Sequence, residues 1–340
     1  MSAFMTVREF EEAARRIEGV VRRTPLVPLP LDRETPVYAK CENLQVAGTF
    51  KIRGAYNFIA QIDPADRRCG VITYSSGNHA QAVAMAARRF RVPAVVVMPV
   101  SAPVIKVEGA RALGAEVLFE GTTSAERKTR AETEASNRGL QMVPPFDDPW
   151  IVAGQGTVGL EILRDCPDLA QVLVPVGGGG LIAGIASVIK QRCPQVRVIG
   201  VEPCGAAKMT ASLSAGHPVS LSQVASVADG LLPVRPGDLT FQYVRRWVDE
   251  ILTVDDGSIV EAALWLFRRA KLVVETSGAA ALAALLNMTN DVASQGSRAG
   301  ATVVVLSGGN ISLETLADLA LGGTASVRSG SRAEDPGDGC

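Results

Sequence analysis

Short apolar runs rich in β-branched residues alternate with longer alanine-rich stretches along most of this chain. The apolar runs are GVITY (70–74), PAVVVMP (93–99), AEVLFE (115–120), QVLVPV (171–176), VRVIGVE (196–202), EILTV (250–254) and ATVVVLS (301–307). The stretches between them, such as AQAVAMAARRF and GAAALAALL, are typical of helices. This alternation predicts βαβ units and an α/β fold built on open, mainly parallel sheets whose faces are covered by helices.

Two changes in this rhythm divide the 340 residues into expected domains. At roughly 150 residues per domain, a chain of this length predicts two. Proline and aspartate cluster in VPPFDDPW (143–150), and the first clear strand–helix unit begins only after residues 50–55. We therefore expect a small α/β domain over residues 53–147, inserted into a larger domain made of residues 1–52 and 148–325. The polar tail 326–340 predicts disorder, and Thr6 is expected to cap an amphipathic first helix.

Composition narrows the class of function. The chain is 47% hydrophobic and only 20% charged, which favours a large buried core. Its net charge is -1 and it has no strongly basic block, so we expect no nucleic-acid partner. No apolar run is long enough to predict a membrane span. None of the six cysteines forms a CxxC pair and only two histidines are present, so neither a metal site nor a disulfide framework is expected, and a reducing cytoplasm is favoured.

Ligands of open parallel sheets bind beyond the carboxyl ends of the strands, so the loops that follow strands carry the candidate chemistry. In VPVGGGGLIAGIA (174–186), four glycines stand between an apolar strand and an apolar helix. Glycine lets several amide groups turn toward one anion, and the helix N-terminus adds partial positive charge. The loop predicts a phosphate site, formed by Gly177, Gly178, Gly179 and Gly180. It lacks the lysine of a Walker loop.

Two other loops add polar groups. In YSSGNHAQAVA (74–84), hydroxyl and amide side chains open a helix, and such a helix start suits a carboxylate. In VVLSGGNIS (304–312), Ser307 offers a neutral hydroxyl beside two glycines. A lysine in the middle of AGTFKIRGA (47–55), Lys51, completes the set. A ligand with a phosphate group, an aromatic nitrogen and an aldehyde that reacts with lysine would use all of these groups. Pyridoxal 5'-phosphate has all three features.

The segments GTFKIRGA, SSGNHAQA, VGGGGL and LSGGN resemble the lysine, asparagine, phosphate and pyridine-nitrogen motifs of a known family. This is the threonine/serine dehydratase and serine racemase family, pyridoxal-phosphate enzymes of the tryptophan-synthase-β-like fold (fold type II). Further similarity comes from PPFDDPWIVAGQGTVGLEIL (144–163) and VADGLLPVRPGDLTF (227–241), and the resemblance runs from about residue 7 to residue 322.

The resemblance implies roles for individual residues. Lys51 would hold the cofactor with Phe50 packed beside it, the four glycines would bind its phosphate, Asn78 would contact the ring hydroxyl, and Ser307 would face the pyridine nitrogen. The substrate carboxylate would lie among Ser75, Ser76, Gly77 and His79, and Glu275 would line the site near the ring. Lys51 would also be the catalytic base.

The resemblance further implies β-elimination from a β-hydroxy L-amino acid, threonine or serine, to give a 2-oxo acid and ammonia, by a homodimer or homotetramer. Serine racemization, or dehydration of hydroxyaspartate or an aryl-serine, remains open. For racemization, Ser76 is the candidate proton donor on the face opposite Lys51. Serine racemases hold magnesium with a glutamate, a carbonyl and an aspartate. Glu202 and Ala206 match the first two, but Lys208 stands at the aspartate position, so no metal is expected.

Two other classes of function stay open. Gly178, Gly180 and Ala183 form a loose dinucleotide fingerprint, with Glu202 ending the next strand, which would suit a nicotinamide oxidoreductase. The chain could also be an amino-acid sensor that keeps the fold without catalysis. A visible absorption band that disappears on borohydride reduction would exclude the nicotinamide enzyme, and a turnover assay would separate the other two.

Overall fold

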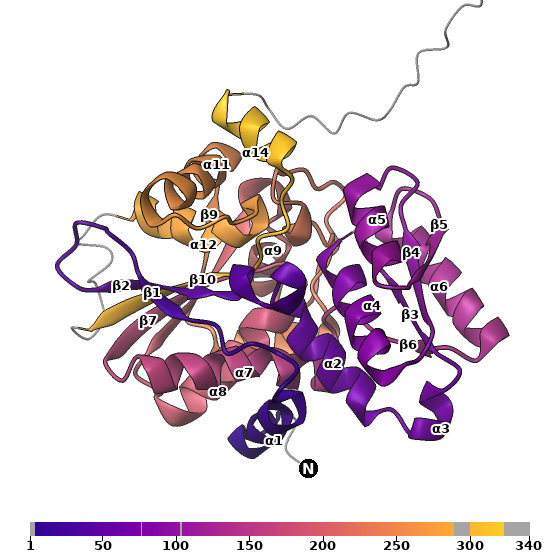
Figure 1. Ribbon diagram of the computed structural model, residues 1–340. Helices are drawn as coiled ribbons and strands as arrows, with labels where there is room; N and C mark the ends of the chain where they lie inside the picture. Colours follow the sequence, from indigo (N-terminus) through magenta and orange to yellow (C-terminus); the bar gives the residue numbers. More distant parts are fainter. Residues whose placement is uncertain (1–3, 76, 103, 289–299, 323–340) are drawn as a thin grey trace, which may run out of the picture.

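Two sheets form the framework of the protein in this computed structural model, which describes residues 4–75, 77–102, 104–288 and 300–322 (Figure 1). The larger sheet has six strands in the order β1-β2-β10-β7-β8-β9, and the smaller has four in the order β5-β4-β3-β6. Strand β1 pairs with β2 in antiparallel fashion, whereas every other pairing in the two sheets is parallel. The expected α/β class with mainly parallel sheets is confirmed.

The strands of the larger sheet are β1 (Leu26–Pro28), β2 (Val37–Cys41), β7 (Leu169–Pro175), β8 (Arg197–Pro203), β9 (Glu250–Val254) and β10 (Ala301–Leu306). Those of the smaller sheet are β3 (Val71–Tyr74), β4 (Ala94–Met98), β5 (Glu116–Phe119) and β6 (Gln141–Met142). All seven expected strands are present. The sequence pattern missed β1, β2 and β6, because β1 and β6 span only three and two residues and β2 carries a buried lysine.

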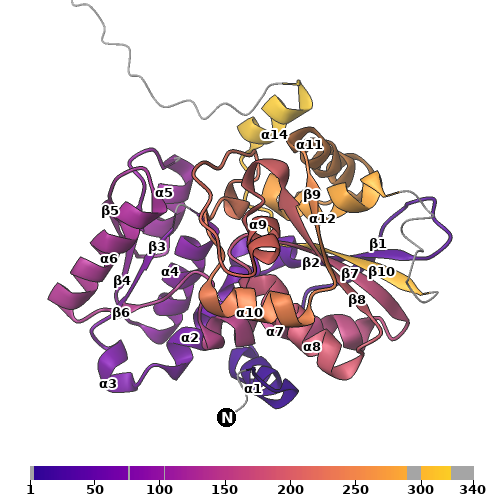
Figure 2. The ribbon, with the colours of Figure 1, turned by 180° about the vertical axis from the view of Figure 1, so that it is seen from behind.

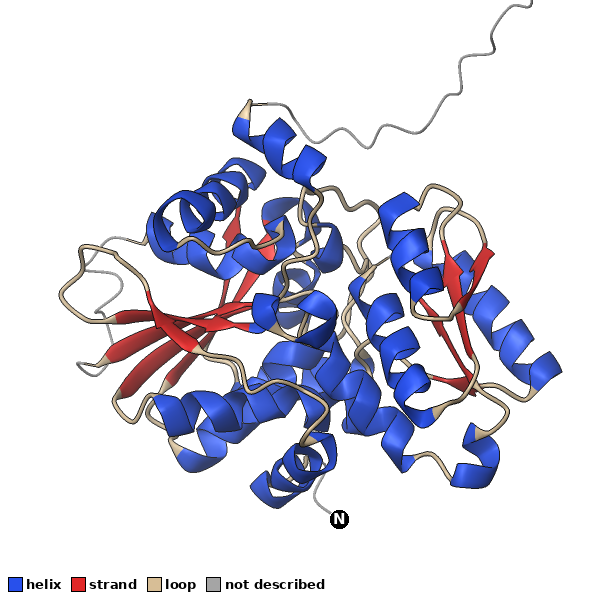
Figure 3. Cartoon of the chain, viewed as in Figure 1, coloured by secondary structure: helices blue, strands red, loops and turns tan. Residues whose placement is uncertain are grey.

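Helices cover both faces of each sheet (Figure 3). The described α-helices are α1 (Val7–Ile17), α2 (Lys51–Gln61), α3 (Pro64–Arg67), α4 (Asn78–Phe90), α5 (Val104–Ala112), α6 (Ser124–Arg138), α7 (Pro149–Asp165), α8 (Gly180–Arg192), α9 (Lys208–Ala215), α10 (Asp238–Trp247), α11 (Asp256–Trp265), α12 (Thr276–Asn287) and α14 (Leu313–Ala320). Short helical turns are η1 (Glu42–Leu44), η2 (Val46–Gly48), η3 (Cys204–Ala206), η4 (Asp229–Leu231) and the π-turn η5 (Leu266–Ala270). Thr6 forms a capping box with Glu9 at the start of α1, as expected.

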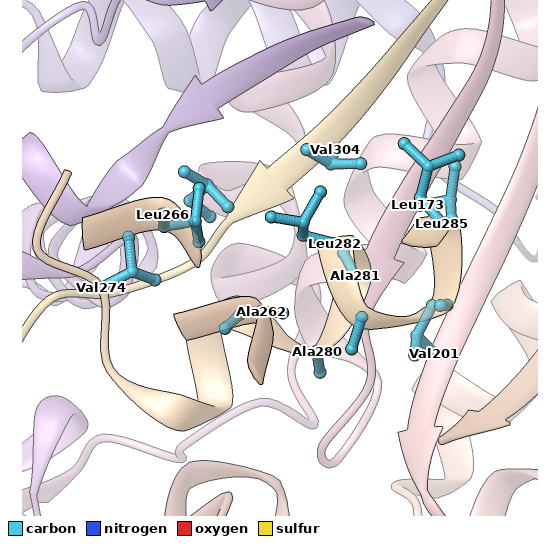
Figure 4. Close-up of a cluster of buried hydrophobic side chains, with 14 of the residues drawn as sticks. Leu173, Val201, Ala262, Leu266, Val274, Ala280, Ala281, Leu282, Leu285 and Val304 are labelled. Carbon is cyan, nitrogen blue, oxygen red and sulfur yellow. The ribbon is translucent and has the colours of Figure 1, made fainter. Parts of the chain in front are cut away.

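The main core lies between the larger sheet and helix α12. This helix consists almost entirely of small and apolar residues, and it packs against β7, β8, β9 and β10. Figure 4 shows Leu282 of α12 beside Val304 of β10, with Leu173 of β7 nearby. On the opposite face, α7 and α8 meet closely because Gly156 and Gly184 have no side chains to separate the two backbones. The large sheet is therefore buried on both faces.

Helix α2 lies between the two parts of the protein. It packs against α7, which covers the larger sheet, and against α4, which covers the smaller sheet. The turned view in Figure 2 shows the smaller sheet with α4, α5 and α6 beside the larger part, to which α7 and α10 belong. Helix α2 also runs across the expected domain boundary at residues 52–53, and the boundary itself stays a prediction. The expected disordered tail, 326–340, lies outside the described residues. No described helix is long and apolar enough to span a membrane.

Candidate active site

Lys51 is fixed at the start of α2 by the loop that follows β10. Thr49 and Gly308 form a short antiparallel bridge, and the Phe50 amide donates a hydrogen bond of 3.2 Å to the Ser307 carbonyl. The Lys51 Nζ donates at 2.8 Å to the carbonyl oxygen of Pro145. Burial lowers the pKa of Lys51 to about 8, because a charged amine is costly where water is excluded. The structure therefore holds a lysine amine that is readily uncharged near neutral pH.

A buried ion network holds the first turn of α2. Arg53 has no exposed surface, and its Nε and Nη2 atoms each donate at 2.8 Å to the Glu42 carboxylate. Its Nη1 atom donates at 2.7 Å to Glu161 of α7. Two carboxylates on separate elements thus bind the planar guanidinium of Arg53, two residues after Lys51. These contacts fix the orientation of the first turn of α2.

The four-glycine loop leaves β7 and enters α8 with its amide groups free. Gly179 has a φ of 99°, which only glycine adopts readily, and α8 begins at Gly180. Among the described residues, none accepts a hydrogen bond from the backbone amide of Gly177, Gly178, Gly179 or Gly180. The Phe146 ring lies against Gly178, where any side chain would overlap it. Gly177 to Gly180 therefore form a glycine cradle, a set of unpartnered amide donors at a helix N-terminus. Such a set can bind an anion.

Asn78, Glu275 and Asn310 form a chain of hydrogen bonds between α4, the start of α12 and the β10 loop. Asn78 Nδ2 donates to Glu275 Oε1 at 2.5 Å, and Asn310 Nδ2 donates to Asn78 Oδ1 at 2.8 Å. Burial, followed by the negative charge of Asp229, raises the pKa of Glu275 to about 8. The expected asparagine and glutamate are thus brought together, and the position of Asn78 is fixed from two sides.

The loop that contains Ser75 and Gly77 follows the carboxyl end of β3 in the smaller sheet. The Ser75 amide donates to the Val97 carbonyl at 3.1 Å, and the Gly77 amide lies 3.4 Å from the Ser75 hydroxyl oxygen. His79 is buried, with Nε2 placed 3.2 Å from the Val143 carbonyl, and burial lowers its pKa to about 3, so the ring is neutral. Contact of Ser75, Gly77 and His79 with a substrate carboxylate stays a prediction, and Ser76 lies outside the described residues.

Ser307 stands at the carboxyl end of β10 and is 5% exposed. Its main-chain oxygen accepts from the Phe50 amide and from the Thr49 hydroxyl, the latter at 3.3 Å. The backbone of the serine is therefore engaged with the Lys51 segment, and no hydrogen bond to its hydroxyl occurs among the residues that the structure describes. A role for that hydroxyl at a pyridine nitrogen stays a prediction.

The segment VPPFDDPW contributes more to the site than the sequence indicated. Besides the Pro145 carbonyl and the Phe146 ring, the Asp147 carboxylate accepts from the amides of Asp238, Leu239 and Thr240 at 3.0 to 3.1 Å. The Thr240 hydroxyl in turn donates to the Gly178 carbonyl at 2.7 Å. The sequence carries two signals here: the cluster of proline and aspartate, which we interpreted as a domain seam, and the family resemblance of residues 144–163 and 227–241, which assigned no role to these residues.

These residues fit pyridoxal phosphate. Four unpartnered amides at a helix N-terminus match a phosphate, and a half-buried amine of lowered pKa matches an aldehyde. The glycine loop lies against Phe146 and the Lys51 amine contacts Pro145, and these two residues are adjacent in the chain. Within the described ranges, no three His, Cys, Asp or Glu residues gather closely enough to hold a metal ion.

Comparison with known proteins agrees with this fit. Residues 17–309 match the family described as pyridoxal-phosphate dependent enzyme. An L-threonine ammonia-lyase of Thermotoga maritima is 43% identical over 315 residues, covering 92% of this chain and 77% of that protein. An L-threo-3-hydroxyaspartate ammonia-lyase of a Pseudomonas species is 39% identical and is covered over 97% of its length, with 92% of this chain.

Solved structures show the same fold. Maize serine racemase matches with a TM-score of 0.88 and 36% identity, covering 93% of this chain and 97% of that one. The processed form of threonine deaminase isoform 2 from Solanum lycopersicum matches with a TM-score of 0.85 and 37% identity, over 93% of this chain and 87% of that one. These neighbours confirm the expected fold type. The chain therefore belongs to the family of pyridoxal-phosphate-dependent enzymes.

Proposed function

We propose that this enzyme is an ammonia-lyase that converts a β-hydroxy L-amino acid, threonine or serine, into a 2-oxo acid and ammonia. The observation that carries the proposal is the Lys51 amine of lowered pKa, held beside the Phe146-covered glycine cradle. Relatives named L-threonine ammonia-lyase, from Thermotoga maritima and Geobacter sulfurreducens, are 43% and 46% identical over most of the chain and support the substrate class.

Bound pyridoxal phosphate makes the Cα–H bond of an attached amino acid acidic and so opens the way to loss of the β-hydroxyl. The amides of Gly177 to Gly180 would hold the phosphate, and Asn78, fixed by Glu275, would orient the ring. Lys51 Nζ takes the Cα proton. The β-hydroxyl leaves as water once it is protonated, and a second water later replaces the amino group. The balance for threonine is therefore one amino acid giving one 2-oxobutanoate and one ammonia.

The neutral Ser307 favours elimination over transamination. A carboxylate at this position would attract a proton to a pyridine nitrogen, because an opposite charge raises the pKa of a base. A serine hydroxyl would exert no such charge, so a bound cofactor would supply a weaker electron sink, which would favour loss of the β-substituent. Asp229, whose charge helps to raise the pKa of Glu275, forms an ion pair with Lys106 of α5, whose own charge lowers that pKa.

The test is a panel of L-threonine, L-serine, threo-3-hydroxyaspartate and phenylserine, with ammonia and 2-oxo acid measured together. We expect equal amounts of both products from threonine or serine, and none from Lys51→Ala. If the enzyme prefers hydroxyaspartate, its substrate would be that named for the Pseudomonas relative instead of threonine or serine. If none of the four substrates releases ammonia from enzyme that is saturated with pyridoxal phosphate, the proposal fails.

Serine racemization is the second candidate, supported by the likeness to maize serine racemase. Racemization needs a proton donor on each face of Cα, and Lys51 serves one face. The sequence offers Ser76 for the other. L-serine in heavy water should then give deuterated D-serine besides pyruvate, and Ser76→Ala should remove D-serine while sparing pyruvate. Absence of D-serine from the wild type would leave elimination alone.

We further propose that the enzyme works in the cytoplasm as a homodimer or homotetramer. All described cysteines, Cys41, Cys69, Cys166, Cys193 and Cys204, are free thiols, which supports a reducing compartment. Apolar side chains that include Phe267, Val273 and Leu313 are exposed, which supports self-association. Light scattering of the purified holoenzyme measures the oligomer directly, and a monomer at micromolar concentration would contradict it.

A further inference from the structure

Lys208 is completely buried, and its ammonium group lies inside a cage of oxygen atoms. Its Nζ atom lies 2.9 Å from the carbonyl oxygens of Val176 and Leu231 and 3.1 Å from that of Ala206. A fourth oxygen, Glu202 Oε1, lies 3.1 Å away. Three backbone carbonyls and one carboxylate are the kind of oxygen set that also surrounds a desolvated metal cation.

The carboxylate in this cage also accepts hydrogen bonds from other donors. Glu202 has no exposed surface, and it also accepts from the Met209 amide at 2.9 Å and from the Thr210 amide at 2.9 Å. These amides belong to the first turn of α9, where the helix dipole favours a negative charge. Glu202 is therefore fixed in place, and the ammonium of Lys208 supplies the positive charge that a buried carboxylate and three carbonyls require.

The oxygens of the cage come from elements that build the cofactor cradle. Val176 directly precedes Gly177, the first glycine of the phosphate loop. Leu231 ends η4, and a side chain on Gly177 would meet the carbonyl of Gly230 in the same turn at 3.1 Å. The Gly230 amide is itself held by Ser277 of α12 at 2.8 Å. The ammonium thus joins Val176, which follows β7, to Ala206 of η3 and Leu231 of η4.

We propose that Lys208 is a positioning residue that serves as a built-in cation and fixes the glycine loop for the cofactor phosphate. The inference rests on the assignment of that loop to phosphate. It has two consequences. The wild-type holoenzyme needs no added metal ion or monovalent cation. Removal of the lysine side chain creates a cation site at the same four oxygens.

The test compares two variants of the holoenzyme. Lys208→Ala leaves an oxygen-lined space that a potassium or ammonium ion can occupy, whereas Lys208→Met fills the same space without charge. We expect both variants to lose bound pyridoxal phosphate at least tenfold faster than the wild type during dialysis in tetramethylammonium buffer. Potassium or ammonium chloride should restore retention and melting temperature in Lys208→Ala only. Lys128→Ala, at an exposed lysine, should behave as the wild type.

Rubidium offers a direct view of the site, because crystals of Lys208→Ala soaked in its chloride should give an anomalous peak among the four oxygens. Equal cofactor retention in the wild type and both variants would overturn the proposal, as would a loss in Lys208→Ala that cations do not reverse. If Lys208→Ala does not fold, the cofactor retention of Lys208→Met alone tests the proposal, and retention equal to that of the wild type would overturn it. Chelator or potassium dependence of the wild type would also overturn it. None of these measurements requires turnover, so they are independent of the proposed reaction.

Discussion

The Nζ atom of Lys51 lies 2.8 Å from the carbonyl oxygen of Pro145, a residue 94 positions later in the chain. The contact joins the first residue of α2 to the loop that leads into α7. Its acceptor is neutral, so no carboxylate offsets the cost of burying a charged amine. The arrangement holds the lysine in place while keeping its proton easy to remove.

Lys51 should therefore react with added pyridoxal phosphate in a strongly pH-dependent way. With a pKa of about 8, about a tenth of the amine is uncharged at pH 7, against well under one in a thousand for an ordinary lysine. We expect the rate constant for cofactor attachment to rise about tenfold per pH unit below pH 8 and to level off above it. Stopped-flow absorbance of the cofactor-free protein measures this rate.

The site of attachment provides the control for this prediction. After borohydride reduction, peptide mass spectrometry should find the pyridoxyl group on Lys51, and Lys51→Ala should carry none there. Lys271→Ala, in which an exposed lysine is removed, should react as the wild type does. A pyridoxyl group found mainly on another lysine would refute the assignment.

Replacement of Arg53 should strongly destabilise the protein, although the residue lies outside the reacting groups. Arg53→Met leaves the buried Glu42 without its bidentate partner, and the loss of one member of such a pair costs about 3–5 kcal/mol of unfolding free energy. The matched control is Arg138→Met. Arg138 makes the same two-pronged contact with Glu116, but its side chain is 37% exposed, so the cost should stay below about 1 kcal/mol. Urea unfolding measures both, and equal costs would contradict the argument.

Sequence patterns located seven of the ten described strands and the glycine loop, because each of these leaves a local signal. An apolar run, four glycines and a second apolar run can be read without knowledge of distant residues. Lys40 shows where this fails. Its charge interrupts the pattern of β2, yet it is fully buried and paired at 2.6 Å with Glu161. A charge that is compensated by a residue far along the chain looks like a surface position in the sequence.

The sequence offered candidates for the site only where a side chain is of a distinctive type. It named Lys51, Asn78 and Ser307, whose roles stay predictions. It did not name Pro145, because that residue contacts the lysine through its carbonyl oxygen, which every residue type has. The sequence singled out Lys208 only because it stands where serine racemases have an aspartate that binds magnesium. Its carbonyl partners depend on how β7, η3 and η4 fold toward one point, and no sequence pattern records that.

Gly178→Ala should weaken cofactor binding at least tenfold, because a methyl group at this position would overlap the Phe146 ring. The loop or the ring must then move, and the amide cradle is distorted. Phe146→Ala in the same molecule removes the obstacle. We expect the double variant to regain part of the lost affinity, measured by fluorescence titration with pyridoxal phosphate. If the double variant binds no better than Gly178→Ala, the ring contact is not the cause.

Ser307→Asp should lower the ratio of elimination to transamination. The carboxylate would favour a protonated pyridine nitrogen, which would make the bound cofactor a stronger electron sink. We expect less 2-oxo acid released with ammonia from serine, together with slow formation of pyridoxamine phosphate, which chromatography detects. Ser307→Ala, a neutral change, should form no more pyridoxamine phosphate than the wild type. An unaltered product ratio in Ser307→Asp would show that this side chain does not face the ring.

Glu275→Gln should remove a decline in the stability of the cofactor-free protein between pH 5 and pH 8. Burial and then the charge of Asp229 raise the pKa of Glu275 from 4.5 to about 8. Between these values the folded protein keeps a proton that the unfolded chain has released, so the free energy of unfolding falls as pH rises. Glutamine has no such proton to lose, and its side-chain oxygen still accepts the hydrogen bond from Asn78.

At pH 8 we therefore expect Glu275→Gln to be more stable than the wild type by up to about 4 kcal/mol, with the difference shrinking toward pH 5. Urea unfolding at pH 5, 6, 7 and 8 measures it. Glu18→Gln, which changes an exposed glutamate, should follow the wild type at every pH. A constant offset between Glu275→Gln and the wild type across this range would mean that Glu275 is already ionised in the folded protein at pH 5. The hydrogen bond from Asn78 would then hold a charged carboxylate, and burial would not control the proton at this position.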